Sequence, residues 1–524
     1  MSSSEKLTWA CNKLDEIRCG DGGAETGQHF VGRMFLVYRL YDLTIERRKG
    51  GEMPAGNGTR FWIVLKGRKK DIPNCREKLR QEEAMTSKHK KTIYGILVFF
   101  LIMAVATMAH AQKTIKFGYI GPMKFIVGQE CSLTAEMAVE DINKAGGIKV
   151  GNTKYKVELV KVDSNEILNI SDAVSAMERL ITVDKVDFIV GGYRTEAVLA
   201  MQEVIGDKKA IWINCYTGSP EPVARVAKNY DRLKYFFKIA TLNSKYIGDV
   251  VFNGLLIVRD KVIKDLGIAK PRVALLGEKA LWVEPVIKDM QKRIPENGME
   301  IAGVWRPSIT AQDVTAELSA IKQSGAHIIR FDACGPIGAV VPKQWGELQI
   351  PAAMIGFDCA SMNDRNWASS GGLINYEATL APFGDAHITP KTMPYFKKLK
   401  ARYGYSPSYC GVCYDAYNVM KAAIERAGTL DKDAVVTALE KTDYVGASGR
   451  IAFTQKGQQW VHDVVFAPGY TTTTIIQWVN GKPMVIWPDG KPFLGDKKWV
   501  GVKYGGTSEY QLPPWMVKYW KSKK

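Results

Sequence analysis

From residue 113 onward, short runs of β-branched and apolar residues alternate with longer stretches of helical periodicity, which leaves few folds open to the chain. The pattern predicts strands at 115–120, 155–162, 187–190 and 210–214, and helices at 130–143, 171–183 (capped by Ser171) and 195–205. Buried strands separated by helices of this length are typical of βαβ units around a parallel sheet.

The same alternation restarts after Phe237. It predicts helices at 243–266, 282–293, 311–324 and 336–347, strands at 272–276, 300–305, 327–331 and 352–355, and later helices at 390–403, 414–427 and 431–441. Residues 477–524, rich in Trp, Pro and Gly, are predicted to form an irregular C-terminal wrap. Two α/β units of similar build predict two lobes with a cleft between them.

Residues 85–111 have the order of a secretory signal peptide. Basic residues at 88–91 precede 93–108, which carry no charge, and Ala109-His110-Ala111 offers small side chains to a signal peptidase. We therefore expect cleavage before Gln112 and export to the periplasm; the alternative is an uncleaved membrane anchor. Residues 1–84 show little sustained periodicity and are expected to be a non-native upstream extension, or disordered, with Met85 as the true start.

Charge and cysteine content exclude several classes of protein. The net charge is +18, of which +11 falls on residues 112–524 without a run of like charges, as on an ordinary solvated surface, so no nucleic-acid partner is expected. Cys410 and Cys413 form a C-x-x-C pair without a second pair or paired His, so the pattern favours packing or a simple disulfide over a metal site. The sequence contains none of the H-E-x-x-H, G-x-S-x-G or P-loop motifs, so we expect no enzyme activity, metal or cofactor.

Four segments resemble a known family. They are Ile115–Pro122, Ala138–Ile148, Tyr414–Gly428 and Gly446–Phe453, and they stand in the family's order behind the signal peptide. In these segments the chain is similar to periplasmic solute-binding proteins of the branched-chain amino acid ABC transporter type, a likeness that covers essentially all of residues 113–480.

The resemblance implies a type I periplasmic-binding fold, two Rossmann-like α/β lobes joined by three hinge crossovers. Lobe 1 would comprise residues 113–238 and 380–444, lobe 2 would comprise 239–379 and 445–480, and 481–524 would wrap on a lobe. It also implies a receptor that captures an amino acid or related carboxylate by hinge closure and delivers it to a membrane permease. Alternatives are a periplasmic sensor of amides, urea-like or aromatic carboxylate compounds, and a repressor, which the export signal disfavours.

A ligand carboxylate is well served by the N–H groups of a helix N-terminus and a hydroxyl. The segment Gly191–Thr195 has this character, and the polar loop after Asn214 ends a neighbouring strand. The resemblance assigns ligand contacts in these turns to Thr195, Tyr216, Thr217 and Gly218. Tyr193 and Arg194 in the same turn are further candidates, since the Arg194 guanidinium could pair with a carboxylate or amide oxygen. Thr195 could instead be a plain N-cap, and Arg194 could form an outward salt bridge.

A ligand ammonium group needs a carboxylate. The resemblance places Asp358 in this role and Trp282 as an aromatic wall; loop capping and core packing are the alternatives. Asp332 and Cys334 follow a predicted strand and are expected at the rim. The sequence departs from leucine-binding relatives at Tyr193–Glu196 and in the loop 122–127, so branched-chain amino acids are not the only ligands that fit.

Overall fold

The computed structural model describes residues 42–48, 62–68 and 113–524, except 363, 383, 385 and 406–410. The chain divides into two compact units, Met1–Ala111 and Gln112–Lys524. In the first, β1 (Asp42–Arg48) pairs antiparallel with β2 (Trp62–Arg68). The predicted signal peptide at 85–111 and Cys410 lie outside the described residues. Within those residues, no helix is both long and apolar enough to cross a membrane.

The first sheet of the second unit has the strand order β4-β5-β3-β6-β7-β8. Its strands are β3 (Thr114–Gly121), β4 (Ile148–Val150), β5 (Thr153–Asp163), β6 (Phe188–Gly191), β7 (Ile211–Asn214) and β8 (Phe236–Lys238). All neighbours are parallel except β4 and β5. Every residue of β6 and β7 is buried, as expected for central strands covered on both faces.

The helices of this half are α5 (Ile126–Lys144), α6 (Ile170–Thr182), α7 (Thr195–Lys208), α8 (Glu221–Lys228) and α9 (Tyr230–Leu233). Three later helices, α15 (Thr392–Tyr403), α16 (Gly411–Ala427) and α17 (Lys432–Glu440), belong to the same half, since α16 packs against α5, β4 and β6.

The second sheet has the order β10-β9-β11-β12-β13-β16-β17. Its strands are β9 (Arg272–Gly277), β10 (Glu300–Trp305), β11 (Ile328–Ala333), β12 (Ala353–Asp358), β13 (Ala378–Ala381), β16 (Thr474–Val479) and β17 (Lys482–Trp487). The pairings from β10 through β13 are parallel, whereas β16 and β17 join antiparallel. Two parallel-rich sheets flanked by helices confirm the predicted α/β class.

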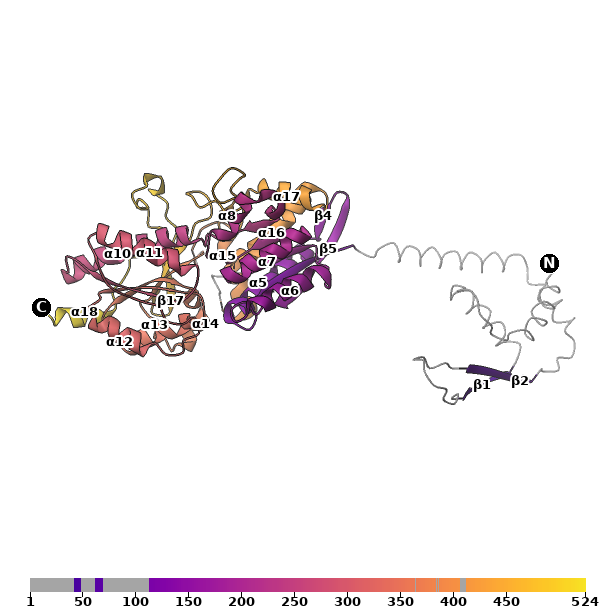
Figure 1. The fold of residues 1–524 in the computed structure, drawn as a ribbon, viewed down its shortest axis with the longest axis horizontal. Helices are drawn as coiled ribbons and strands as arrows, with labels where there is room; N and C mark the ends of the chain where they lie inside the picture. Colours follow the sequence, from indigo (N-terminus) through magenta and orange to yellow (C-terminus); the bar gives the residue numbers. More distant parts are fainter. Residues whose placement is uncertain are drawn as a thin grey trace. The chain divides into compact units, whose positions relative to one another are not determined.

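Helices cover both faces of this sheet. They are α10 (Ser244–Leu266), α11 (Val283–Glu296), α12 (Thr315–Gln323), α13 (Ile337–Glu347), α14 (Asp364–Ser369) and α18 (Pro514–Lys521). Figure 1 shows α10 and α11 on one face, with α12 and α13 on the other. The side chain of Asn243 accepts bonds from the Lys245 and Tyr246 amides at the start of α10, and Gly267 ends the helix in the left-handed region.

Some sequence predictions were wrong in detail. The N-cap of α6 is Asn169, whose side chain accepts from the Ser171 amide, so Ser171 already lies inside the helix. The segment predicted as an irregular wrap contains β17 and α18. Strand β17 was missed because Pro483 and the flanking Gly residues signal turns, whereas pairing with β16 supplies the order. The two short strands β14 (Tyr444–Val445) and β15 (Arg450–Ile451) were also missed.

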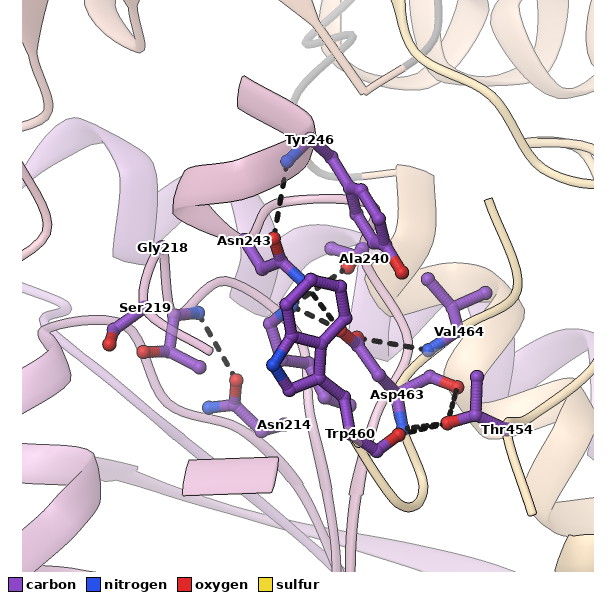
Figure 2. A network of polar contacts seen from close by, with 12 residues as sticks. Asn214, Gly218, Ser219, Ala240, Asn243, Tyr246, Thr454, Trp460, Asp463 and Val464 are labelled. Carbon is purple, nitrogen blue, oxygen red and sulfur yellow. Dashed lines mark hydrogen bonds and ion pairs between the residues drawn. The ribbon is translucent and has the colours of Figure 1, made fainter. Parts of the chain in front are cut away.

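The chain passes between the sheets after β8, after β13 and again before β16. How the remaining residues divide between the two lobes stays a prediction. A buried ion pair lies at the first passage: Lys238 Nζ is 3.0 Å from Asp463 Oδ1, and both side chains are fully buried. Figure 2 shows Asn243 donating to the same carboxylate, and the Asn243 Nδ2 to Asp463 Oδ2 distance is 2.8 Å. One carboxylate is thus shared by the last residue of β8, the cap of α10 and the third passage of the chain between the sheets.

We predict that this pair is essential for stability. Lys238→Met leaves the Asp463 carboxylate buried without its cation and should lower the free energy of unfolding by about 3–5 kcal/mol. Lys245→Met is the matched control, because Lys245 is half exposed and pairs with Asp249 across one helical turn; its cost should stay below about 1 kcal/mol. Urea unfolding of both variants tests the prediction, and equal losses would contradict it.

Candidate ligand-binding site

A cavity lies between the two sheets, at the carboxyl ends of their strands. The volume that the centre of a water-sized sphere can occupy in it is about 30 Å³, so the cavity is small in this arrangement of the two walls. Its lining residues are Ile167, Tyr193, Arg194, Thr195, Glu196, Tyr216, Gly218, Glu278, Ala280, Trp282, Ile309, Cys334 and Phe357. Carboxyl ends of parallel strands are the usual place for ligands in open α/β sheets, since the loops and helix N-termini converge there.

The wall from the first sheet is built on a turn that requires glycine. Gly191 and Gly192 adopt φ values of +117° and +85°, and a Cβ on Gly191 would lie 2.1 Å from the Ile120 carbonyl oxygen. The turn leads from β6 into the N-terminus of α7, where Thr195 begins the helix. Thr195 Oγ1 lies 3.0 Å from Thr217 Oγ1, so two hydroxyls meet at the positively polarised end of the helix dipole.

A buried carboxylate supports this turn from behind. One oxygen of Glu166 accepts bonds of 2.9 Å from the amides of both Tyr193 and Arg194, and the other accepts from the Ser164 hydroxyl at 2.8 Å. The sequence prediction treated the backbone amides of this turn as ligand donors. Two of them are instead bonded to Glu166, which leaves the first turn of α7 and the Thr195 hydroxyl for a ligand.

Arg194 is held by its own lobe. Its Nη1 donates to the Ile167 carbonyl at 2.8 Å and its Nε lies 3.2 Å from Glu196 Oε2. The ion pair with Glu196 resembles the salt bridge that the sequence analysis gave as the alternative role of Arg194, although Arg194 still lines the cavity. Thr217 lies behind Thr195, fully buried, and its amide donates to Asn214 Oδ1 at 3.1 Å.

The wall from the second sheet combines aromatic rings with a carboxyl group. Trp282 and Phe357 meet edge to face, with ring centroids 5.3 Å apart. The indole N–H of Trp282 donates to Glu278 Oε1 at 3.1 Å, and the Gly335 amide donates to Oε2 at 2.8 Å. Burial raises the pKa of Glu278 to about 7 despite these bonds. Sequence reasoning missed Glu278, although it lies two residues after the strand predicted at 272–276 and four before Trp282.

Asp358 is not among the residues that line the cavity. Its Oδ1 accepts from the Ala360 amide and its Oδ2 lies 2.8 Å from Ser361 Oγ, which is itself 2.6 Å from Glu377 Oε2. The serine hydroxyl has one proton to donate, so one of the two carboxyl groups must hold a proton. Burial accordingly raises the pKa of Glu377 well above its ordinary value and that of Asp358 to about 7.

Asp332, predicted at the rim, is also buried away from the cavity, where it lies 3.1 Å from the guanidinium of Arg330. Cys334, two residues further on, does line the cavity. The structure therefore brings together Tyr193, Arg194, Thr195, Tyr216, Gly218 and Trp282 around one cavity, with Thr217 directly behind them.

The two walls touch one another. Tyr193 Oη donates to the Cys334 carbonyl, and the Leu281 amide lies 3.4 Å from Glu196 Oε1. The Ser244 hydroxyl lies 3.0 Å from the carbonyls of both Gly218 and Trp282. Contacts of this kind close the cavity on two sides, which is the arrangement expected of a hinged pair of lobes around a ligand.

Comparison with known proteins identifies the family. A family model described as periplasmic binding protein matches residues 114–469. The chain belongs to the periplasmic binding protein family.

Relatives and solved structures agree with this membership. The Leu/Ile/Val-binding protein homolog 3 of Brucella melitensis is 25% identical, over 74% of this chain and 96% of that protein. The isoleucine complex of a branched-chain amino acid transporter substrate-binding protein from Streptococcus pneumoniae superposes with a TM-score of 0.58, at 19% identity, over 71% of this chain and 98% of the other. A Rhodopseudomonas palustris solute-binding protein in complex with 3,4-dihydroxybenzoic acid gives 0.57, at 20% identity, over 71% and 95%.

The buried carboxyl under the Tyr193 turn should make stability depend on pH. Burial raises the pKa of Glu166 from 4.5 to about 7, so between these values the folded state holds a proton that the unfolded chain releases. The free energy of unfolding should therefore fall as pH rises through this window, by at most about 1.4 kcal/mol per pH unit from this group.

We predict that Glu166→Gln makes this slope shallower by about 1 kcal/mol per unit, since glutamine can keep both amide bonds without titrating. Urea unfolding at pH 5, 6 and 7 measures the slope. Glu158→Gln, at an exposed position of β5, is the control and should leave it unchanged. An unaltered slope in Glu166→Gln would refute the assignment.

Proposed function

We propose that this periplasmic binding protein is the extracytoplasmic solute receptor of an ABC importer, which captures an amino acid or related small carboxylate by hinge closure and hands it to a membrane permease. The cavity between the two walls carries the proposal, because its polar groups and aromatic rings converge on one space at the carboxyl ends of both sheets. Two relatives are named as a Leu/Ile/Val-binding protein or a homolog of one, and these names support the proposal.

The two charged ends of an amino acid have separate places in the proposed complex. The carboxylate would lie at the N-terminus of α7 with the hydroxyl of Thr195, where the helix dipole and N–H groups favour an anion. The ammonium would lie against Glu278, the lining carboxyl of the opposite wall, rather than Asp358. The ligand's side chain would pack on Trp282 and Phe357.

This arrangement supplies enough free energy for micromolar binding, which needs about 8 kcal/mol. Lobe closure excludes water, so the pairing of each ligand charge strengthens as the effective dielectric constant falls. Hinge closure requires no covalent step, and each lining residue acts by binding or orienting the solute.

Aromatic carboxylates are a second candidate. The edge-to-face corner of Trp282 and Phe357 favours a flat ring, and a structural neighbour binds 3,4-dihydroxybenzoic acid. A benzoate has no ammonium group, so its binding would not depend on a charged Glu278. The two ligand classes therefore differ in their response to that residue.

A thermal-shift panel on the purified protein, unfolded and refolded to remove any retained solute, tests the proposal. We expect one class among amino acids, amides and benzoates to raise the melting temperature, since a ligand at 100 times its dissociation constant adds about 2.7 kcal/mol. Glu278→Gln should weaken an amino acid about tenfold or more and spare a benzoate. Glu284→Gln, on the exposed start of α11, is the matched control. A panel in which no solute stabilises the protein would sink the receptor assignment.

We also propose that the exported protein begins at or next to Gln112, after cleavage behind Ala109-His110-Ala111. Expression in a Gram-negative host followed by osmotic shock should release a protein with this N-terminus, as read by Edman degradation or mass spectrometry. Replacing Ala109 and Ala111 by Leu should block cleavage and retain the chain at the membrane. A mature N-terminus far from residue 112 would contradict the assignment.

A further inference from the structure

Two cysteines end neighbouring strands in the wall of the cavity. The last register pair of β11 and β12 is Ala333 with Asp358, and each of these residues is followed by a cysteine, Cys334 and Cys359. The Cys359 amide donates to the Ala333 carbonyl at 3.1 Å, so the two strands are still adjacent at this level. Neighbouring strands lie about 4.8 Å apart, which suits the Cα separation that a disulfide needs.

The two thiols are also neighbours. Cys334 and Cys359 continue the register of Ala333 and Asp358, so their side chains point to the same face of the sheet, and both cysteines are free. After burial, the neighbouring Cys359 thiol is the next cause that raises the pKa of the Cys334 thiol. Cys359 is buried, whereas Cys334 is only half-buried and lines the cavity. One thiol of the pair can therefore be reached from the cavity, and the second lies directly behind it.

We propose that Cys334 and Cys359 form a dithiol site that closes to a disulfide within the cavity wall when the protein meets a disulfide-bearing oxidant. The inference rests on the proposed function in one respect, because an exported protein works in a compartment where such oxidants are maintained.

The chemistry balances as two successive exchanges. The Cys334 thiolate attacks one sulfur of the oxidant disulfide and releases one thiol, which leaves a mixed disulfide on Cys334. The Cys359 thiolate then attacks the Cys334 sulfur and releases the second thiol. Two electrons and the two cysteine protons pass to the oxidant, and one S–S bond forms in the protein. Burial raises the pKa of the Cys334 thiol, so the first exchange is slow at neutral pH.

The site connects to closure of the cavity through Tyr193. The Tyr193 hydroxyl reaches across from the opposite wall and donates to the Cys334 carbonyl, next to the thiol of the same residue. Tyr193 therefore covers Cys334 while the walls are in contact, and opening the walls uncovers it. Conversely, a disulfide would fix the end of this strand. That strand end supplies the carbonyl that accepts from Tyr193 and an amide that donates to Glu278.

A second thiol pair serves as an internal control. Cys215 and Cys413 are also neighbours, since the Cys413 thiol adds to the burial that raises the pKa of the Cys215 thiol, but both side chains are fully buried and neither lines the cavity. Contact alone would oxidise both pairs, whereas access from the cavity would oxidise only Cys334 and Cys359.

The test uses the purified, fully reduced protein incubated with oxidised glutathione, then alkylated in denaturant and mapped by peptide mass spectrometry. We expect a crosslink between the Cys334 and Cys359 peptides, with Cys215 and Cys413 alkylated as free thiols. Tyr193→Phe should speed crosslinking about fivefold, since it removes one hydrogen bond that keeps the site covered. Cys359→Ser should stop at a mixed disulfide with glutathione on Cys334.

Full alkylation of both cysteines, a stable mixed disulfide on Cys334 in the unsubstituted protein, or crosslinking of Cys215 to Cys413 at the same rate would overturn the proposal. The map needs no ligand and no export, so its result is independent of the solute panel. A panel without a binder would overturn the proposed function and leave the thiol site standing, whereas a binder with no crosslink would do the reverse.

Discussion

A single buried carboxylate, that of Asp463, links the parts of the chain that pass between the two sheets. It neutralises the fully buried ammonium of Lys238 and accepts from the Asn243 side chain that caps α10. Two unpaired charges at this depth would each cost several kcal/mol, so the three segments are stable only together. The His462 ring, stacked 3.9 Å from Phe237, holds the same segment against β8. This cluster therefore ties the first and third passages of the chain together beside the two cavity walls.

Four carboxyl groups at or near the cavity are buried away from water. Glu166 binds the amides of the Tyr193 turn, Glu278 binds an indole and an amide, and Asp358 shares a serine with Glu377. Burial raises the pKa of each of these four groups, and the bonds they accept oppose the shift. Glu166 supports the first wall from behind, and Glu278 alone among the four lines the cavity.

The strand and helix pattern could be predicted because it is a local property of the chain. The strand expected at 300–305 coincides with β10, and the helix expected from Asn243 is α10 with Asn243 as its cap. Strand β8 was not found because its three residues carry too little periodicity, and β17 was not found because Pro483 and the flanking Gly residues signal turns; both owe their order to a neighbouring strand. Within the site, the turn after β6 could be recognised from the sequence, because Gly191, Gly192 and Thr195 lie close together in the chain.

The sequence by itself determined the α/β alternation and the glycine turn that leads into α7, because each depends on residues close together in the chain; the place of Trp282 in the wall was expected only from the family resemblance. Only the tertiary structure decided which acidic side chain reaches the cavity. Asp358 and Glu278 both follow buried strands, and nothing local distinguishes them. Ser361 and Glu377 draw Asp358 into a protonated pair, whereas Trp282 and Gly335 hold Glu278 at the wall. Ser361 and Trp282 are close in sequence to the carboxyl groups they contact, but Glu377 and Gly335 come from more distant segments, so their effect exists only once the sheet has assembled.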